Sequence, residues 1–146
     1  MRLDQAPLNL ISHSVEETMQ MGEDLALQLK AGDVVALNGD LGAGKTAFAA
    51  GIAKGLGVTD YVTSPTFAIM NILEGRLPFH HFDVYRITDP DEMEEIGLNE
   101  FLYGEGVCVI EWADRIEDLL PARYIDVRMS RIDETERRLT IENISR

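Results

Sequence analysis

The residues with the clearest chemical potential form a G-x-x-x-x-G-K-T motif, which runs from Gly39 to Thr46 directly after the apolar run 34–37. Glycines let the backbone wrap tightly, so that successive N–H groups point at phosphate oxygens. A helix that begins at such a turn adds the positive end of its dipole, and Lys45 and the Thr46 hydroxyl can reach the outer phosphates and Mg²⁺. The motif therefore predicts a phosphate-binding loop (P-loop) for a nucleoside triphosphate. The predicted nucleotide contacts of this loop are Asp40, Leu41, Gly42, Ala43, Gly44, Lys45, Thr46 and Ala47.

Two acidic residues stand directly after apolar segments that are typical of strands. Asp83 follows the segment 77–82, and Glu111 follows the segment 107–110. Hydrolysis or phosphoryl transfer needs a second carboxylate for Mg²⁺ or water, usually at the end of a neighbouring strand. We therefore predict that Lys45, Asp83 and Glu111 are catalytic and that Thr46, Asp83 and Glu111 serve the metal. The spacing does not decide which acid contacts the metal and which orients water.

Three further candidate residues have an alternative structural explanation. The hydroxyls of Ser64 and Thr66 lie in a predicted loop that can fold over the γ-phosphate as a switch, or they can cap a turn. Trp112 follows Glu111 and either packs in the core or forms an aromatic wall of the nucleotide pocket.

Cationic side chains near the first acid are less specific. Arg86 lies one turn beyond Asp83, where it can meet developing phosphate charge or form an ion pair with that aspartate. His80 and His81 are adjacent, so in a strand they face opposite sides. This geometry is poor for a shared metal and favours a structural role for both histidines.

The pattern of apolar residues and turn residues predicts how these groups are positioned. Ser14 and Glu17 form a capping box that begins a helix running to about Lys30. Predicted strands cover 8–11, 67–73, 77–82, 107–110, 124–129 and 138–141, and further helices cover 46–56, 89–97 and 114–120. Helices alternate with strands early and strands dominate later. The prediction is an α/β fold with one P-loop NTPase domain over 1–146, a mixed central sheet flanked by helices, and antiparallel hairpin additions.

Composition narrows the class of protein. The chain has 146 residues, 45% of them hydrophobic, with a single cysteine, Cys108, in an apolar run. No apolar run is long enough to cross a bilayer, and residues 1–7 lack the apolar core of a secretory signal. We expect a cytoplasmic protein in which Cys108 is a buried small hydrophobe.

The net charge of −13 bears on the partners. Affinity for nucleic acid depends largely on neutralising phosphates, so strong direct binding to nucleic acid is not expected. Between Asp83 and Asp118 there are 12 acidic and two basic side chains. This segment is either a solvated acidic face or a surface that attracts a basic protein partner.

Four segments together resemble a known family. The segments 38–46, 64–67, 81–86 and 110–112 read NGDLGAGKT, SPTF, HFDVYR and IEW, in that order. They are similar to the small bacterial ATPase of tRNA threonylcarbamoyladenosine synthesis, the TsaE (YjeE) family. The resemblance spans roughly 11–124 and departs from the family pattern at Ala47 and Leu73, where Thr and Tyr are common.

The resemblance implies a single P-loop α/β domain that hydrolyses ATP weakly alone. It implies that the protein docks on the TsaD–TsaB complex and supports its repeated turnover, while those partners transfer the threonylcarbamoyl group to adenosine 37 of tRNA. By motif, Lys45 and Thr46 would hold phosphate and Mg²⁺, and Trp112 would lie near the nucleotide. Asp83 and Glu111 would be the essential acids. Ser64 and Thr66 would belong to a switch-like loop.

Three other nucleotide-binding functions fit the sequence less well. A P-loop small-molecule kinase usually has an arginine-bearing lid, and no arginine cluster separates the P-loop from Glu111. A GTPase is disfavoured because the chain has no N-K-x-D element and no D-x-x-G element after the loop. A nucleotide sensor that does not hydrolyse ATP is disfavoured by the two acids at strand ends. The kinase and the sensor stay as alternatives.

Overall fold

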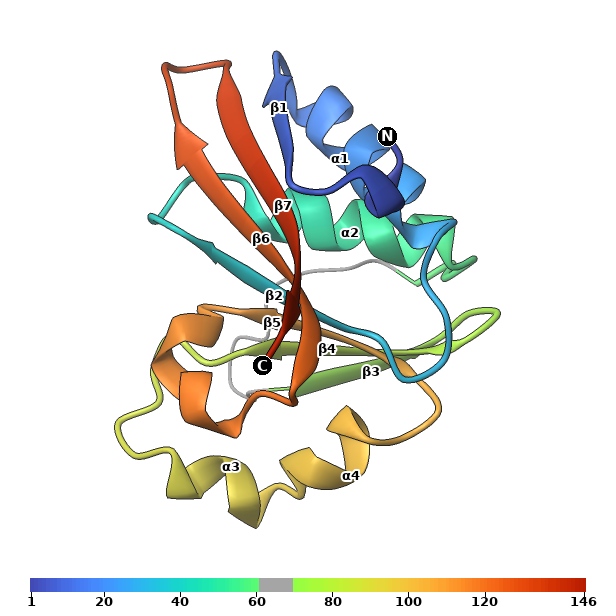
Figure 1. Cartoon of the computed structure of the whole chain (residues 1–146), viewed down its shortest axis with the longest axis vertical. Helices are drawn as coiled ribbons and strands as arrows, with labels where there is room; N and C mark the ends of the chain where they lie inside the picture. Colours follow the sequence, from blue (N-terminus) through green and yellow to red (C-terminus); the bar gives the residue numbers. More distant parts are fainter. Residues whose placement is uncertain (61–69) are drawn as a thin grey trace.

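The computed structural model describes residues 1–60 and 70–146, and seven strands join in one sheet (Figure 1). The strands are β1 (Leu8–Ser12), β2 (Val34–Gly39), β3 (Met70–Glu74), β4 (Pro78–Asp83), β5 (Val107–Glu111), β6 (Arg123–Arg131) and β7 (Arg137–Ser145). The helices are α1 (Val15–Ala26), α2 (Lys45–Gly55), α3 (Asp91–Glu95) and α4 (Leu98–Leu102), with 3₁₀ helices η1 (Leu3–Gln5) and η2 (Ala113–Leu119).

The sheet has the order β1-β7-β6-β2-β5-β4-β3 and is mixed. β2 pairs in parallel with β5 and β6, and β4 pairs in parallel with β5. β3 is added antiparallel to β4, and β1 and β7 are added antiparallel beyond β6. β2 is apolar and buried from Val34 to Leu37, as expected for a parallel strand covered on both faces. The predicted mixed α/β sheet with antiparallel additions is confirmed.

Two hydrophobic clusters fill the two faces of the sheet. One cluster holds Leu25 of α1, Phe48 and Ile52 of α2 and the sheet residues that face them. The other holds Met93 of α3, Leu98 of α4, Ile116 of η2 and the sheet residues that face them. Figure 1 shows α1 and α2 together on one side and α3 and α4 on the other. Among the described residues, no helix combines the length and apolar character that a membrane span requires.

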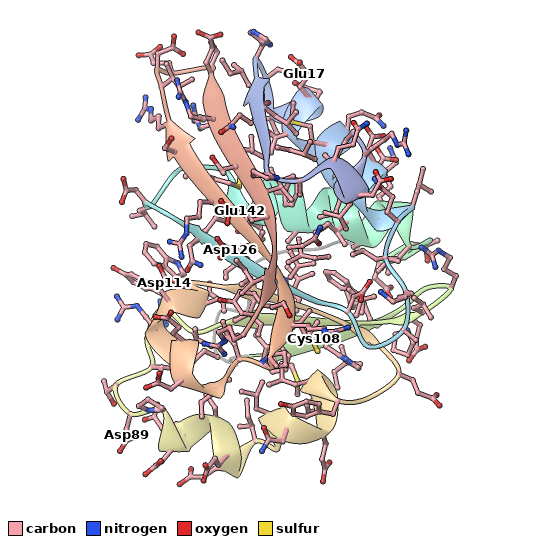
Figure 2. The ribbon with its side chains drawn as sticks, in the orientation of Figure 1. Glu17, Asp89, Cys108, Asp114, Asp126 and Glu142 are labelled. Carbon is pink, nitrogen blue, oxygen red and sulfur yellow. The ribbon has the colours of Figure 1, made fainter. Side chains whose placement is uncertain are left out.

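Cys108 lies in the second cluster, as expected for a small hydrophobe (Figure 2). Burial raises the pKa of its thiol to about 12. The thiol is therefore protonated at neutral pH, which makes it a poor nucleophile.

The predicted cap of the first helix is confirmed, but its predicted end is wrong. Ser14 Oγ accepts a hydrogen bond from the backbone N–H of Glu17 at 3.0 Å. α1 ends at Ala26 instead of about Lys30. The reason is a tightened last turn, in which Gln28 N donates to Leu25 O and Leu29 N donates to Ala26 O.

The helices of the acidic segment between Asp83 and Asp118 are also shorter and more interrupted than predicted. The predicted helix that ends at Gly97 is present as α3, but a second short helix, α4, follows it. Gly97 adopts φ 76°, which ends one helix and lets the chain begin the next. The predicted helix over 114–120 is a 3₁₀ segment, η2, interrupted by non-helical angles at Ile116.

Candidate nucleotide-binding site

The predicted P-loop connects β2 to α2. Gly39 ends β2, and a side chain there would clash because a Cβ would lie 2.3 Å from Met129 O. Gly44 precedes α2 with φ 99°, a left-handed conformation that glycine adopts without strain. Ala43 N donates to Asp40 O at 3.0 Å, which closes the loop. The geometry is a strand, a tight glycine turn and a helix N-terminus, which is the arrangement that binds phosphate.

Lys45 is folded back over its own loop. Its Nζ donates to Gly39 O at 2.6 Å and to Asp40 O at 2.9 Å, and it lies 4.0 Å from the centre of the Trp112 ring. Burial lowers the pKa of Lys45, against the opposing effect of nearby carboxylates, with Glu111 the largest. The ammonium group is thus held at the loop by acceptors that a phosphate group could replace.

The two predicted acids end neighbouring strands at the same level. The β4–β5 pairing sets Asp83 beside Glu111, and the β2–β5 pairing sets Glu111 beside Leu37. Glu111 is buried with 2% of its surface exposed, and Asp83 is half-buried. Thr46 Oγ1 donates to Glu111 Oε1 at 3.1 Å. The sheet therefore brings the P-loop hydroxyl to one of the two acids, which the spacing left open.

The environment of Asp83 differs from that of Glu111. Burial raises the pKa of Asp83, and the neighbouring Glu111 carboxylate raises it further. A hydrogen bond from the backbone N–H of Tyr85 at 3.0 Å has the opposite effect. Two acids in one row with different partners are suited to different roles.

His81 makes a contact that the sequence analysis missed. Its Nε2 lies 2.5 Å from Glu111 Oε2, and both side chains are buried. The predicted opposite orientation of the two histidines is confirmed, because His80 packs instead against Phe101 and Cys108. Because residues two apart in a strand share a face, the sequence already placed His81 on the same face as Asp83, and its position near the acids could have been predicted.

Trp112 forms a wall beside the P-loop as well as packing on the core. Its backbone has φ 64° and ψ 35°, and its N–H donates to Leu37 O at 2.9 Å. The ring contacts Lys45 and lies 4.7 Å from the Tyr85 ring, while Arg115 lies over both aromatic rings. Arg115 was not predicted at this site.

The remaining predicted residues are less informative. Arg86 is exposed beyond the end of β4. Ser64 and Thr66 lie outside the described residues.

Within the described part of the chain, no three His, Cys, Asp or Glu side chains lie close enough together to bind a metal ion by themselves. Proteins usually bind Mg²⁺ through one or two carboxylates, waters and substrate phosphates. Thr46, Glu111 and Asp83 supply such oxygen atoms.

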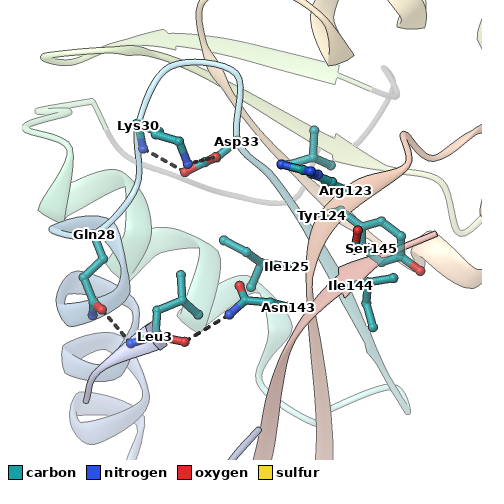
Figure 3. A pocket seen from close by; sticks show the side chains of 11 residues that line it. Leu3, Gln28, Lys30, Asp33, Arg123, Tyr124, Ile125, Asn143, Ile144 and Ser145 are labelled. Atoms are coloured by element: carbon teal, nitrogen blue, oxygen red, sulfur yellow. Dashed lines mark hydrogen bonds and ion pairs between the residues drawn. The ribbon is translucent and has the colours of Figure 1, made fainter. Parts of the chain in front are cut away.

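A hollow of about 340 Å³ lies at the end of the sheet away from the P-loop, beside the beginnings of β2 and β6 (Figure 3). Four of its polar side chains, Gln28, Lys30, Asp33 and Asn143, already have partners. Gln28 accepts from Leu3 N, Asn143 donates to Leu3 O, and Lys30 pairs with Asp33. The P-loop end of the sheet is therefore the stronger candidate site.

Comparisons with known proteins agree with this geometry. A family model described as "Threonylcarbamoyl adenosine biosynthesis protein TsaE" matches residues 12–139. A tRNA threonylcarbamoyladenosine biosynthesis protein TsaE of Bacillus subtilis is 47% identical over 126 residues, covering 86% of this chain and 78% of the relative. A protein of the same name from Treponema pallidum is 38% identical over 134 residues, covering 92% and 99%.

A crystal structure of Bacillus subtilis YdiB superposes with a TM-score of 0.81 at 38% identity, covering 95% of this chain and 86% of that one. The fold is that of a P-loop NTPase, which implies nucleotide binding. The family match covers most of the chain, from the end of β1 into β7. The chain belongs to the TsaE family.

Proposed function

We propose that this protein is an ATPase dependent on Mg²⁺ and that it acts as an accessory subunit in tRNA threonylcarbamoyladenosine biosynthesis. The observation that supports hydrolysis best is the hydrogen bond from Thr46 of the P-loop to the buried Glu111. A buried carboxylate costs free energy unless a cation or donors meet it. The relatives' name, tRNA threonylcarbamoyladenosine biosynthesis protein, supports the pathway.

Each residue has a proposed role. Lys45 would exchange the carbonyl oxygens of Gly39 and Asp40 for the outer phosphates of ATP. Thr46 can donate to Glu111 while its oxygen keeps lone pairs for the metal. Mg²⁺, when bound, neutralises charge on the phosphates. Glu111, which meets Thr46, is the better candidate for the metal side of the nucleotide. Asp83, which is less buried, is the better candidate for orienting water, and Trp112 lines the nucleotide.

The proposed partners are TsaD and TsaB, with tRNA contact falling to them. α3, α4 and η2 carry exposed acidic side chains at Asp91, Glu94, Glu95, Glu100, Glu117 and Asp118. Figure 2 shows Asp89 and Asp114, at the edges of the same region. This surface suits a basic protein face and repels a polyanion. We also propose that residues 1–146 form one domain and that the protein is cytoplasmic.

The test measures ATP binding by calorimetry and phosphate release, with and without Mg²⁺ and the TsaD–TsaB complex. Lys45→Ala should weaken ATP binding at least about tenfold and abolish phosphate release. Lys54→Ala is a matched control, because Lys54 lies on the same helix, points to Glu23 at 3.9 Å and is well exposed. Wild-type protein that neither binds nor hydrolyses ATP, alone or with the complex, would contradict the proposal. Stimulation by TsaD–TsaB that does not weaken with salt would contradict the acidic docking surface.

A further inference from the structure

The side chain of His81 has one hydrogen-bond partner among the described residues, and it is Glu111. The Nε2 atom lies 2.5 Å from Glu111 Oε2, while Nδ1 is buried without a partner in the described part of the chain. A carboxylate can only accept, so with Glu111 in that form the bond is donated by the Nε2–H group of His81.

The register of the sheet explains this contact. His81 pairs with Val109, and Asp83 pairs with Glu111, so His81 lies one row before Glu111 on the same face of the sheet. The Phe79 ring packs 5.8 Å from the imidazole, and His81 has 0% exposure. In these surroundings Glu111 is the acceptor that sets the orientation of the ring.

The two oxygens of Glu111 are thereby divided between two donors. Oε2 is held by His81, and Oε1 is the nearer acceptor for Thr46, at 3.1 Å against 3.4 Å for Oε2. We propose that His81 is a positioning residue that holds Glu111 toward the Thr46 hydroxyl and thereby sets the affinity of the site for Mg²⁺. This inference rests on the proposed function, which places Glu111 on the metal side of the nucleotide.

The experiment compares His81→Leu and His81→Gln with the wild type. Binding of ADP is measured by calorimetry without Mg²⁺ and with increasing Mg²⁺, and ATP turnover is measured over the same range. His81→Leu should bind ADP normally without Mg²⁺ but need about 10- to 100-fold more Mg²⁺, as is common when the partner of a metal-binding group is removed. His81→Gln should recover most of this loss, because its amide N–H can donate to the same oxygen.

His80→Leu is the matched control for packing. His80 is the neighbouring residue on β4, is 9% exposed, and contacts Phe101 and Cys108 on the opposite face. It should keep the Mg²⁺ dependence of the wild type. A folded His81→Leu protein with unchanged Mg²⁺ dependence would overturn the inference, and so would a loss of equal size in His80→Leu.

A measurement without nucleotide separates this inference from the proposed function. In ¹⁵N NMR spectra of the imidazole rings, His81 should carry its proton on Nε2, and this signal should move in Glu111→Gln. If the chemical shift of His81 is unchanged in Glu111→Gln, the positioning role is wrong, regardless of whether the protein binds or hydrolyses ATP. If the His81 signal does move in Glu111→Gln but the wild-type protein binds no ATP, the proposed function is wrong and the hydrogen bond between His81 and Glu111 is still supported.

Discussion

Replacing Glu111 by glutamine should separate the contribution of this buried acid to protein stability from its contribution to ATP hydrolysis. The amide of Glu111→Gln can accept from His81 Nε2 and donate to Thr46 Oγ1, so both contacts at Glu111 can be kept. Each bond loses the extra strength of a charged acceptor, about 1 kcal/mol, but the cost of burying a charge disappears. Because these effects oppose each other, we expect the free energy of unfolding to change by less than about 1 kcal/mol.

Glu111→Leu is the contrasting variant. It leaves the buried His81 ring without a partner at either nitrogen within the described residues, which should cost about 1–3 kcal/mol. Both variants should lose ATP turnover by roughly 100-fold or more, because neither carries a carboxylate at the end of β5. The two substitutions should therefore differ in stability and agree in activity.

The assay is urea unfolding without nucleotide, followed by phosphate release with ATP and Mg²⁺. A loss of about 3–5 kcal/mol in Glu111→Gln would contradict the expected small change in stability, since that is the cost of breaking a buried ion pair. Wild-type turnover in Glu111→Gln would refute the catalytic role of the acid.

Three further predictions test the loop and the second acid. Lys45→Met should weaken Mg²⁺–ATP binding at least about tenfold in calorimetry, through loss of a charge-assisted contact; unchanged affinity would exclude a phosphate contact. Gly39→Ala should destabilise the fold more than Gly42→Ala in urea unfolding, because both glycines have a positive φ but only a Cβ at Gly39 also clashes, 2.3 Å from Met129 O; equal losses would contradict this. Burial raises the pKa of Asp83 above 3.8, so its contribution to stability is fully present below pH 3.8 and is lost as the pH rises through the folded-state pKa. Asp83→Asn should therefore become more stable relative to the wild type with rising pH, and a pH-independent difference would contradict this.

Local patterns predicted the elements whose causes are local. The Ser14 cap, the glycine turn before α2 and the antiparallel β3–β4 pair each depend on residues close in the chain. The predicted helix boundaries were wrong where hydrogen bonds in a turn, or a glycine, end a helix earlier than its helix propensity indicates. α1 stops at Ala26 through i+3 bonds, and α4 begins after Gly97 in a segment that showed only one cap.

The residue types of the site can be read from the chain alone: a P-loop with Lys45 and Thr46, and two acids that follow strand-like segments. The sequence also carried the family resemblance, since both depend on identity and order along the chain. The contact of Thr46 with Glu111, and the contact of His81 with the other oxygen of Glu111, become visible only in the folded protein. Thr46 and Glu111 are 65 residues apart, and their contact follows from the register of the parallel strands. That register is set by packing summed over the whole sheet, which no local segment encodes.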